Sequence, residues 1–179
     1  ADELIVLTRS IESASPSLEW RASADGSYTV RNINTDLAVG TRVMLQLRPD
    51  AAEYAEFPRL AGLLRRYGQY LEQDVAVEQT GEKGGIEYTS GARGLWSFDS
   101  ENQEDALEEA SRELGFRPID AIPMYDADLG LQATAYVLPE PAGYSHAGAH
   151  RLYLKRMFVS DTDVQGTPHW ASFVRCVIN

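Results

Sequence analysis

The residues best suited to chemistry are few and lie mostly in the second half of the chain. His146 and His150 are four residues apart, which is the spacing of two metal ligands on one helix. However, Pro141, Gly143 and Gly148 fall in the same segment and disfavour a helix there. We therefore expect both histidines to lie in a solvated loop rather than in a metal site.

Carboxylates are concentrated between residues 99 and 113, where they could supply a paired acid and base. Their place in the first turn and along one flank of a predicted helix favours a solvated face instead. Cys176 lies among apolar residues, so we expect an inert core thiol. The sequence holds no P-loop, GxGxxG, nucleophile elbow or HExxH motif. It therefore assigns no catalytic residue and no metal ligand.

The elements that position these residues begin with a predicted antiparallel sheet. Residues 4–8 form an apolar, β-branched run, and Asp25-Gly26 separates two alternating segments, 18–22 and 28–33, as in a β-hairpin. In residues 40–48, Val43, Leu45 and Leu47 alternate with polar residues, and Pro49 ends the strand. Trp20 is expected to pack in the core or across strands.

Helical periodicity follows in three segments, 53–71, 101–115 and 168–178. Ser100 and Gln103 form a capping-box signature before the second helix, and Gly115 ends it. In the third, Trp170 is expected on the packed face. Strands are predicted at 75–77, 131–138 and, most clearly, 151–159. The glycine-rich stretch 80–94 is typical of a linker, in which residues 86–89 could still pair as a short edge strand.

Composition limits the class of protein. The 179 residues carry 27 acids against 16 bases, a formal net charge of −11. This balance argues against a nucleic-acid partner and against adhesion to anionic membranes, and no apolar run is long enough to span a bilayer. A single cysteine excludes an intramolecular disulfide and a multi-cysteine zinc site, and weakly favours the cytoplasm. Because the chain lacks an initiator Met and opens and closes in apolar runs, we expect an excised piece of a longer protein.

In order, these segments resemble the heat-shock protein 90 chaperone family. The most specific are RLYLKRMFVSD at 151–161 and HWASFVRCVIN at 169–179, which match family segments in residue type, spacing and mutual distance. GTRVMLQLRPD at 40–50, RRYGQYL at 65–71 and GLW at 94–96, before an acidic helix, are weaker matches. The ordered set covers most of the chain.

The resemblance implies an α/β (α+β) fold and a domain plan. Residues 1–79 would be the C-terminal part of a Bergerat-type ATP-binding domain, an antiparallel sheet with a helix. Residues 80–93 would be a linker, and residues 94–179 the N-terminal part of an α/β sandwich middle domain. The parent protein would be a cytoplasmic, dimeric ATPase of a divergent bacterial type that uses ATP and Mg²⁺. It would assist the folding of unfolded or partly folded client proteins during stress.

The resemblance also implies roles for four residues. Thr41 would hold the adenine amino group through a water, and Val43 would line the same site. Trp96 matches a tryptophan implicated in client contact, although a packing role is equally open. Arg156 matches an arginine of the middle-domain strand and would make a client or inter-domain contact.

The family's metal-holding Asn, adenine-binding Asp and glycine-rich lid precede these residues, and its γ-phosphate arginine follows them. No bound cofactor is therefore expected on this chain alone. The loop at 139–150 also departs from the apolar, aromatic loop of the family.

Two readings of function remain open. One is an inter-domain fragment of an ATP-dependent chaperone, and the other is a non-catalytic α/β protein-interaction module. A small hydrolase that uses His146 or His150 ranks below both.

Overall fold

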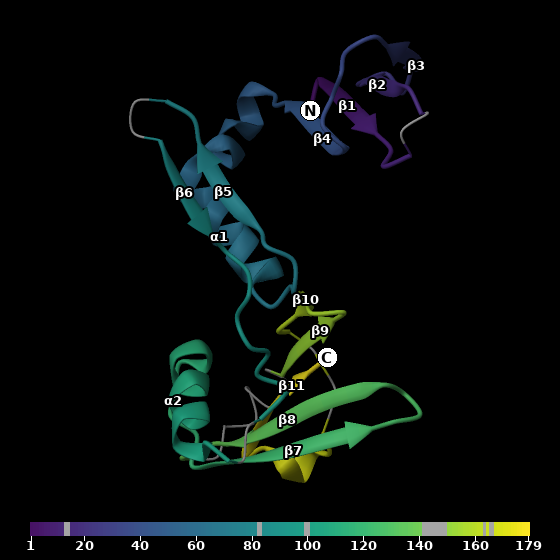
Figure 1. Cartoon of the computed structure of the whole chain (residues 1–179). Helices are drawn as coiled ribbons and strands as arrows, with labels where there is room; N and C mark the ends of the chain where they lie inside the picture. The colour runs from purple at the N-terminus through teal and green to yellow at the C-terminus, as the bar shows by residue number, and fades with distance from the viewer. Residues whose placement is uncertain (13–14, 82–83, 99–100, 141–149, 163, 165–166) are drawn as a thin grey trace. The chain divides into compact units, whose positions relative to one another are not determined.

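The computed structural model describes residues 1–12, 15–81, 84–98, 101–140, 150–162, 164 and 167–179 (Figure 1). The chain divides into two compact units, Ala1–Leu60 and Ala61–Asn179, and each is described by itself. The chain is of the mixed α/β class that the sequence predicts, and its sheets are antiparallel except for the parallel pairing of β9 with β11. None of the helices in the described ranges is long and apolar enough to cross a membrane.

The first unit is built on a four-stranded antiparallel sheet in the order β3-β2-β1-β4. Its strands are β1 (Glu3–Arg9), β2 (Ser17–Ser23), β3 (Tyr28–Ile33) and β4 (Gly40–Gln46). The predicted hairpin is confirmed: Ala22 pairs with Tyr28, and Gly26 turns the chain with a φ of +85°. The Asp25 carboxylate accepts the Ser27 N–H at 2.9 Å, so the side chain fixes the turn.

One face of this sheet is apolar and exposed. The register places Val6 opposite both Trp20 and Val43, and Trp20 opposite Val30, so these side chains share a face. Val30, Val43 and Leu45 are each 58% exposed. The alternation predicted for residues 40–48 is therefore confirmed, and the apolar side it defines lies open. Trp20 packs across strands, as expected, with its ring 6.3 Å from that of Tyr28.

The helix predicted from residue 53 begins later. Pro49–Ala55 forms the 3₁₀ helix η1, and α1 spans Phe57–Gly68, with Pro58 in its first turn, where proline is tolerated. Ala61 and Gly68 are its buried residues, whereas Leu60 and Tyr67 of the predicted apolar face are exposed. The boundary between the two units falls within this helix.

The second unit contains α1 from Ala61 onward, a hairpin, a second helix and a five-stranded sheet. The hairpin pairs β5 (Ala76–Gln79) with β6 (Gly85–Tyr88), so the expected linker 80–93 includes a short strand. The helix α2 spans Gln103–Leu114, and the sheet has the order β10-β9-β11-β8-β7. Its strands are β7 (Asp120–Asp126), β8 (Leu131–Val137), β9 (Arg151–Leu154), β10 (Met157–Ser160) and β11 (Val174–Ile178).

The ends of α2 depart in one respect from the expected boundaries. Gly115 ends the helix in a left-handed conformation with φ of +78°, as predicted. The N-cap is Asn102. Ser100, which begins the predicted capping box, lies outside the described residues. Strand β7 was not predicted, because Pro123 interrupts its apolar pattern. It lies at the edge of the sheet, where proline is tolerated.

The helix predicted at 168–178 is wrong. Only the single 3₁₀ turn η3 (His169–Ala171) is helical, and β11 follows it. This strand pairs with β8 on one side and β9 on the other, so it is central in the sheet. A central strand buried on both faces is a continuous apolar run, which periodicity cannot distinguish from a buried helix. Trp170, expected to pack, is 72% exposed.

The single strand predicted at 151–159 is a hairpin. Lys155 and Arg156 have φ values of +49° and +68°, and they reverse the chain between β9 and β10. The turn contains neither Gly nor Asn, the usual signals for this geometry, so the sequence conceals it. The Asn179 side chain stabilises the turn by accepting the Arg156 backbone N–H at 2.8 Å.

Candidate functional site

Thr41 lines a cavity in the first unit. The cavity holds about 250 Å³, and its walls are Leu7, Leu37, Ala38, Val39, Gly40, Thr41 and Arg42. It forms where β4 begins, at Gly40, whose φ of +131° is one that side-chain-bearing residues rarely adopt. The local backbone therefore requires glycine immediately before the threonine.

The hydroxyl of Thr41 is held by Thr8 on β1. The two side-chain oxygens are 2.8 Å apart, and Thr8 Oγ1 also donates to the Gly40 carbonyl oxygen at 3.3 Å. A hydroxyl has one proton, so Thr8 donates its proton to the Gly40 carbonyl oxygen and accepts a hydrogen bond from Thr41. The lone pairs of Thr41 then remain able to accept an N–H from a ligand or a water. Sequence reasoning missed Thr8, because a strand threonine carries no signal of its partner.

Arg9 fixes the wall of the cavity. Its guanidinium pairs with Asp36, and Nη1 donates to the Leu37 carbonyl oxygen at 2.7 Å. These contacts tie the segment before β4 to the end of β1. The cavity is therefore positioned by a side chain that lies about 30 residues earlier in the sequence.

The residues of this cavity suit the base of a nucleotide better than its phosphates. Leu7, Leu37 and Val39 offer apolar walls to a flat ring, and Thr41 offers an acceptor to an amino group. No group of three or more His, Cys, Asp or Glu side chains that could hold a metal ion occurs within the described parts of the chain. The lining thus offers apolar walls and a hydroxyl acceptor to a flat ring that carries an amino group, and it also includes the cationic residue Arg42. Val43 lies two positions along the same strand face and is not among the residues that line the cavity.

Trp96 lies in the core of the second unit. Its side chain is 3% exposed, and its ring centroid lies 5.0 Å from those of Tyr70 and Tyr153. A Cβ on Gly94 would lie 2.3 Å from the indole, so the backbone packs directly against the ring. Of the two roles left open for Trp96, packing is the one that the structure shows.

The tyrosines of this core are structural rather than reactive. Tyr136 donates its phenol proton to the Leu95 carbonyl oxygen at 2.7 Å, which fixes the segment that carries Trp96. Burial raises the pKa of Tyr70, Tyr136 and Tyr153, so all three phenols stay protonated at neutral pH.

Arg156 joins the β9–β10 turn to the segment after α1. Its Nη2 lies 2.8 Å from Glu72 Oε1, and its Nη1 donates to the Tyr70 carbonyl oxygen at 3.5 Å. These two contacts of Arg156 both lie within the second unit. They hold the turn against the residues that flank the aromatic core.

His150 is buried, and its expected place in a solvated loop is wrong. It is 3% exposed, because it immediately precedes β9, which pairs with β11. Its Nδ1 accepts the Cys176 backbone N–H at 2.9 Å, and its Nε2 lies 3.0 Å from Thr167 Oγ1. His146 lies outside the described residues, so its relation to His150 is not described.

Cys176 is buried and most of the acids of α2 are solvent-exposed, as the sequence predicts. Cys176 is buried, and burial raises the pKa of its thiol, which keeps it unreactive. The acids of α2 mostly face solvent: Glu104, Asp105, Glu108 and Glu113 are exposed.

Comparison with known proteins points to one kind of relative. No family model matches the chain. The chaperone protein HtpG of Vibrio campbellii is 26% identical over 198 residues, which cover 100% of this chain and 31% of that protein. HtpG of Citrobacter koseri is 26% identical over 194 residues, with coverages of 100% and 31%. HtpG of Rickettsia bellii is 23% identical over 169 residues, with coverages of 89% and 27%.

These matches cover 89% to 100% of the chain, at low identity. The chain spans about 30% of the length of the curated relatives it matches. What the comparisons support is therefore a family-level relation to HtpG, the chaperone of the heat-shock protein 90 type that the sequence resembles.

Proposed function

We propose that this chain is the inter-domain segment of an ATP-dependent chaperone of the heat-shock protein 90 type. The observation that carries the proposal is similarity to HtpG along the whole chain. Residues 1–79 would close the ATP-binding domain, residues 80–93 would link the domains, and residues 94–179 would open the middle domain. The whole protein would act as a cytoplasmic homodimer on unfolded or partly folded clients.

The Thr41 cavity supports a role for this chain in binding the adenine of ATP, with the phosphates bound elsewhere. Thr41 would accept the adenine amino group, directly or through a water, while the apolar walls exclude solvent from the ring. Val43 would continue that wall in the complete domain. ATP brings its phosphates and Mg²⁺, and these would be held by residues outside this chain. Trp96 and Arg156 would support the inter-domain region by fixing its core and its turn.

Calorimetry with Mg-ATP tests this proposal. The product of the complete reading frame should bind Mg-ATP, and the 179-residue chain should bind it much more weakly. In the complete product, Thr41→Val should weaken binding about five-fold, since one hydrogen bond contributes about 1 kcal/mol. Thr29→Val, on the exposed strand β3, is the matched control and should leave affinity unchanged. Absence of Mg-ATP binding by the complete product would overturn the proposal.

A second candidate is a non-catalytic protein-interaction module. The exposed apolar face of β3 and β4 favours it, because such faces mark interaction surfaces. An aggregation assay with and without ATP distinguishes the two candidates. A chaperone should suppress aggregation of a heat-denatured substrate in a manner that depends on ATP, whereas a binding module should show no effect of ATP.

A further inference from the structure

Three arginines surround a cavity in the second unit of a chain whose net charge is −11. Arg65 and Arg66 come from the last turn of α1, and Arg151 is the first residue of β9. The cavity holds about 280 Å³, and its lining also includes Gln69, Glu113, Tyr153, Phe158 and Asp161. We refer to it as the arginine cavity. Its lining residues are separate from those of the Thr41 cavity.

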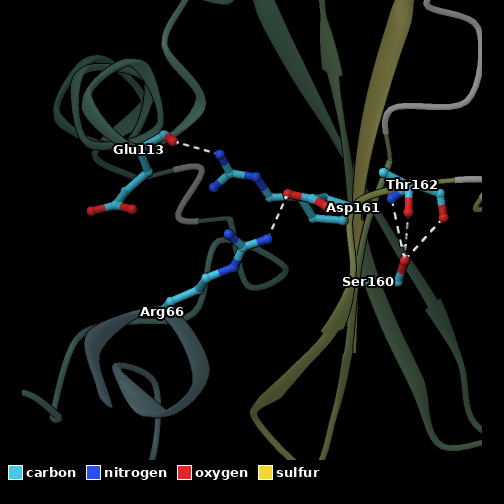
Figure 2. A network of polar contacts seen from close by, with 6 residues as sticks. Arg66, Glu113, Ser160, Asp161 and Thr162 are labelled. Carbon is cyan, nitrogen blue, oxygen red and sulfur yellow. Dashed lines mark hydrogen bonds and ion pairs between the residues drawn. The ribbon is translucent and has the colours of Figure 1, made fainter. Parts of the chain in front are cut away.

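Two of the guanidinium groups are held in place by neutral partners. The Arg66 guanidinium carbon lies 5.1 Å from the centre of the Phe158 ring, so the aromatic face supports it. Arg151 Nη2 donates to the Glu113 backbone carbonyl oxygen at 2.8 Å (Figure 2). Each arginine is thereby positioned with further N–H donors remaining, and such forks match the oxygens of carboxylates and phosphates.

A carboxylate of the chain itself already contacts this cluster. Asp161 Oδ2 lies 3.5 Å from Arg66 Nη2, and the turn that carries it is shaped by bonds between Ser160 and Thr162 (Figure 2). The Arg66 and Asp161 side chains are 57% and 44% exposed, and exposed pairs of this kind are weak. A carboxylate oxygen of the chain thus reaches Arg66 at this position and is held only weakly there.

Arg175 carries a further positive charge that interacts with Arg151. The pKa of Arg175 is lowered, mainly by burial and then by repulsion from Arg151. Glu87 is paired with Arg65, whereas the Glu113 carboxylate accepts from the neutral amide of Gln69 at 3.4 Å and keeps its negative charge in the lining. An added anion would relieve the repulsion between Arg151 and Arg175.

We propose that the arginine cavity binds the phosphate group of a small ligand, with Arg66 and Arg151 as its main donors. The donors come from two elements, α1 and β9, and so approach from two directions. A tetrahedral phosphate can accept from both, whereas a planar carboxylate is matched by a single guanidinium fork. The phosphate could come from free inorganic phosphate or from a phosphomonoester, including a nucleotide.

Isothermal titration calorimetry of the 179-residue chain with inorganic phosphate, at low ionic strength, tests the site. We expect Arg66→Gln and Arg151→Gln each to weaken binding at least ten-fold. Arg59→Gln is the matched control, because Arg59 lies on α1 but pairs with Glu53 in the first unit. Asp161→Asn should tighten binding at least three-fold, an effect that a purely structural network would not produce. Circular dichroism of each variant checks the fold.

The result that overturns the proposal is equally specific. It fails if wild type does not bind phosphate, if Arg66→Gln binds as Arg59→Gln does, or if Asp161→Asn binds no better than wild type. Titrations with phosphoserine and AMP distinguish the sources. Binding of AMP that Arg66→Gln weakens supports a nucleotide in this cavity, and binding of phosphoserine alone supports another monoester. Binding of AMP that is lost in Thr41→Val and kept in Arg66→Gln overturns the nucleotide source for this cavity.

Discussion

The imidazole of His150 accepts a hydrogen bond from the backbone N–H of Cys176, with 2.9 Å between His150 Nδ1 and the amide nitrogen. The acceptor nitrogen must carry a lone pair, so the ring is neutral and its proton is on Nε2, which faces Thr167 Oγ1 at 3.0 Å. A side chain just before β9 thereby satisfies a buried amide of the central strand β11. Burial, and then the charge of Arg175, lower the pKa of His150 below the ordinary histidine value of about 6.5.

This bond predicts a loss of stability in mild acid. Well above pH 6.5 the histidine is neutral in the folded and unfolded chains and contributes no pH dependence. Below pH 6.5 the unfolded chain takes up a proton that the folded chain resists, so the free energy of unfolding falls until the folded pKa is passed. Urea unfolding between pH 5 and 8 should show this decline. His150→Asn, which keeps an acceptor but does not titrate, should flatten it.

The same substitution at His146 and at His169 assigns the effect to one histidine. If His150→Asn declines as steeply as wild type, the bond to Cys176 does not control the pH dependence.

Gly94→Ala should strongly destabilise the second unit. The new methyl group would lie 2.3 Å from the Trp96 indole, and Trp96 is enclosed by Tyr70 and Tyr153. Overpacking of this kind costs about 1–3 kcal/mol or more. Gly62→Ala is the matched control, because nothing lies within 4 Å of its Cβ position in α1. That variant should gain about 0.5–1 kcal/mol from helix propensity. Equal urea midpoints for the two variants would contradict the close packing of Trp96.

Lys155→Asn should stabilise the β9–β10 turn. Lys155 is exposed and has a φ of +49°, a left-handed conformation that costs most side chains roughly 1–2 kcal/mol. Asn adopts this conformation more readily, so we expect a gain of about 0.5–1 kcal/mol in the free energy of unfolding. Lys155→Ala removes the same side chain without relieving the backbone and should show no such gain. A gain of the same size from alanine would trace the effect to charge instead.

Val43→Thr and Leu45→Thr together should reduce the exposed apolar surface of the first unit. Both side chains are 58% exposed on β4, and threonine has the β-branched shape that a strand favours. We expect lower fluorescence of the dye ANS and higher solubility, with the circular dichroism spectrum preserved. The control is Thr29→Ser on β3, which leaves the apolar face intact. Unchanged dye binding in the double variant would mean that this face is not the exposed apolar surface.

Local signals predicted the elements whose boundaries are set by nearby residues. Asp25-Gly26 predicted the β2–β3 hairpin, Gly115 predicted the end of α2, and the alternation of Val43 and Leu45 predicted β4. Each of these depends on backbone conformation or side-chain period within a few residues. The candidate Thr41 was found through a resemblance that rests on an intact local segment.

Other features depend on partners far away in the chain. The segment 168–178 is strand rather than helix because β8 and β9 pair with it on both sides, and an apolar run alone does not reveal those partners. The turn at Lys155 and Arg156 is held by Asn179 and Glu72, which lie at least 23 residues away.

The sequence by itself determined the α/β class, the first antiparallel sheet, the buried thiol of Cys176 and the resemblance to a chaperone family. The tertiary structure decided that Trp96 is enclosed, that His150 is buried and bonded to β11, and that three arginines meet around one cavity. The physical reason is that periodicity and turn chemistry are local properties of the chain. Burial, hydrogen-bond partners and the convergence of charges arise only when distant segments pack together.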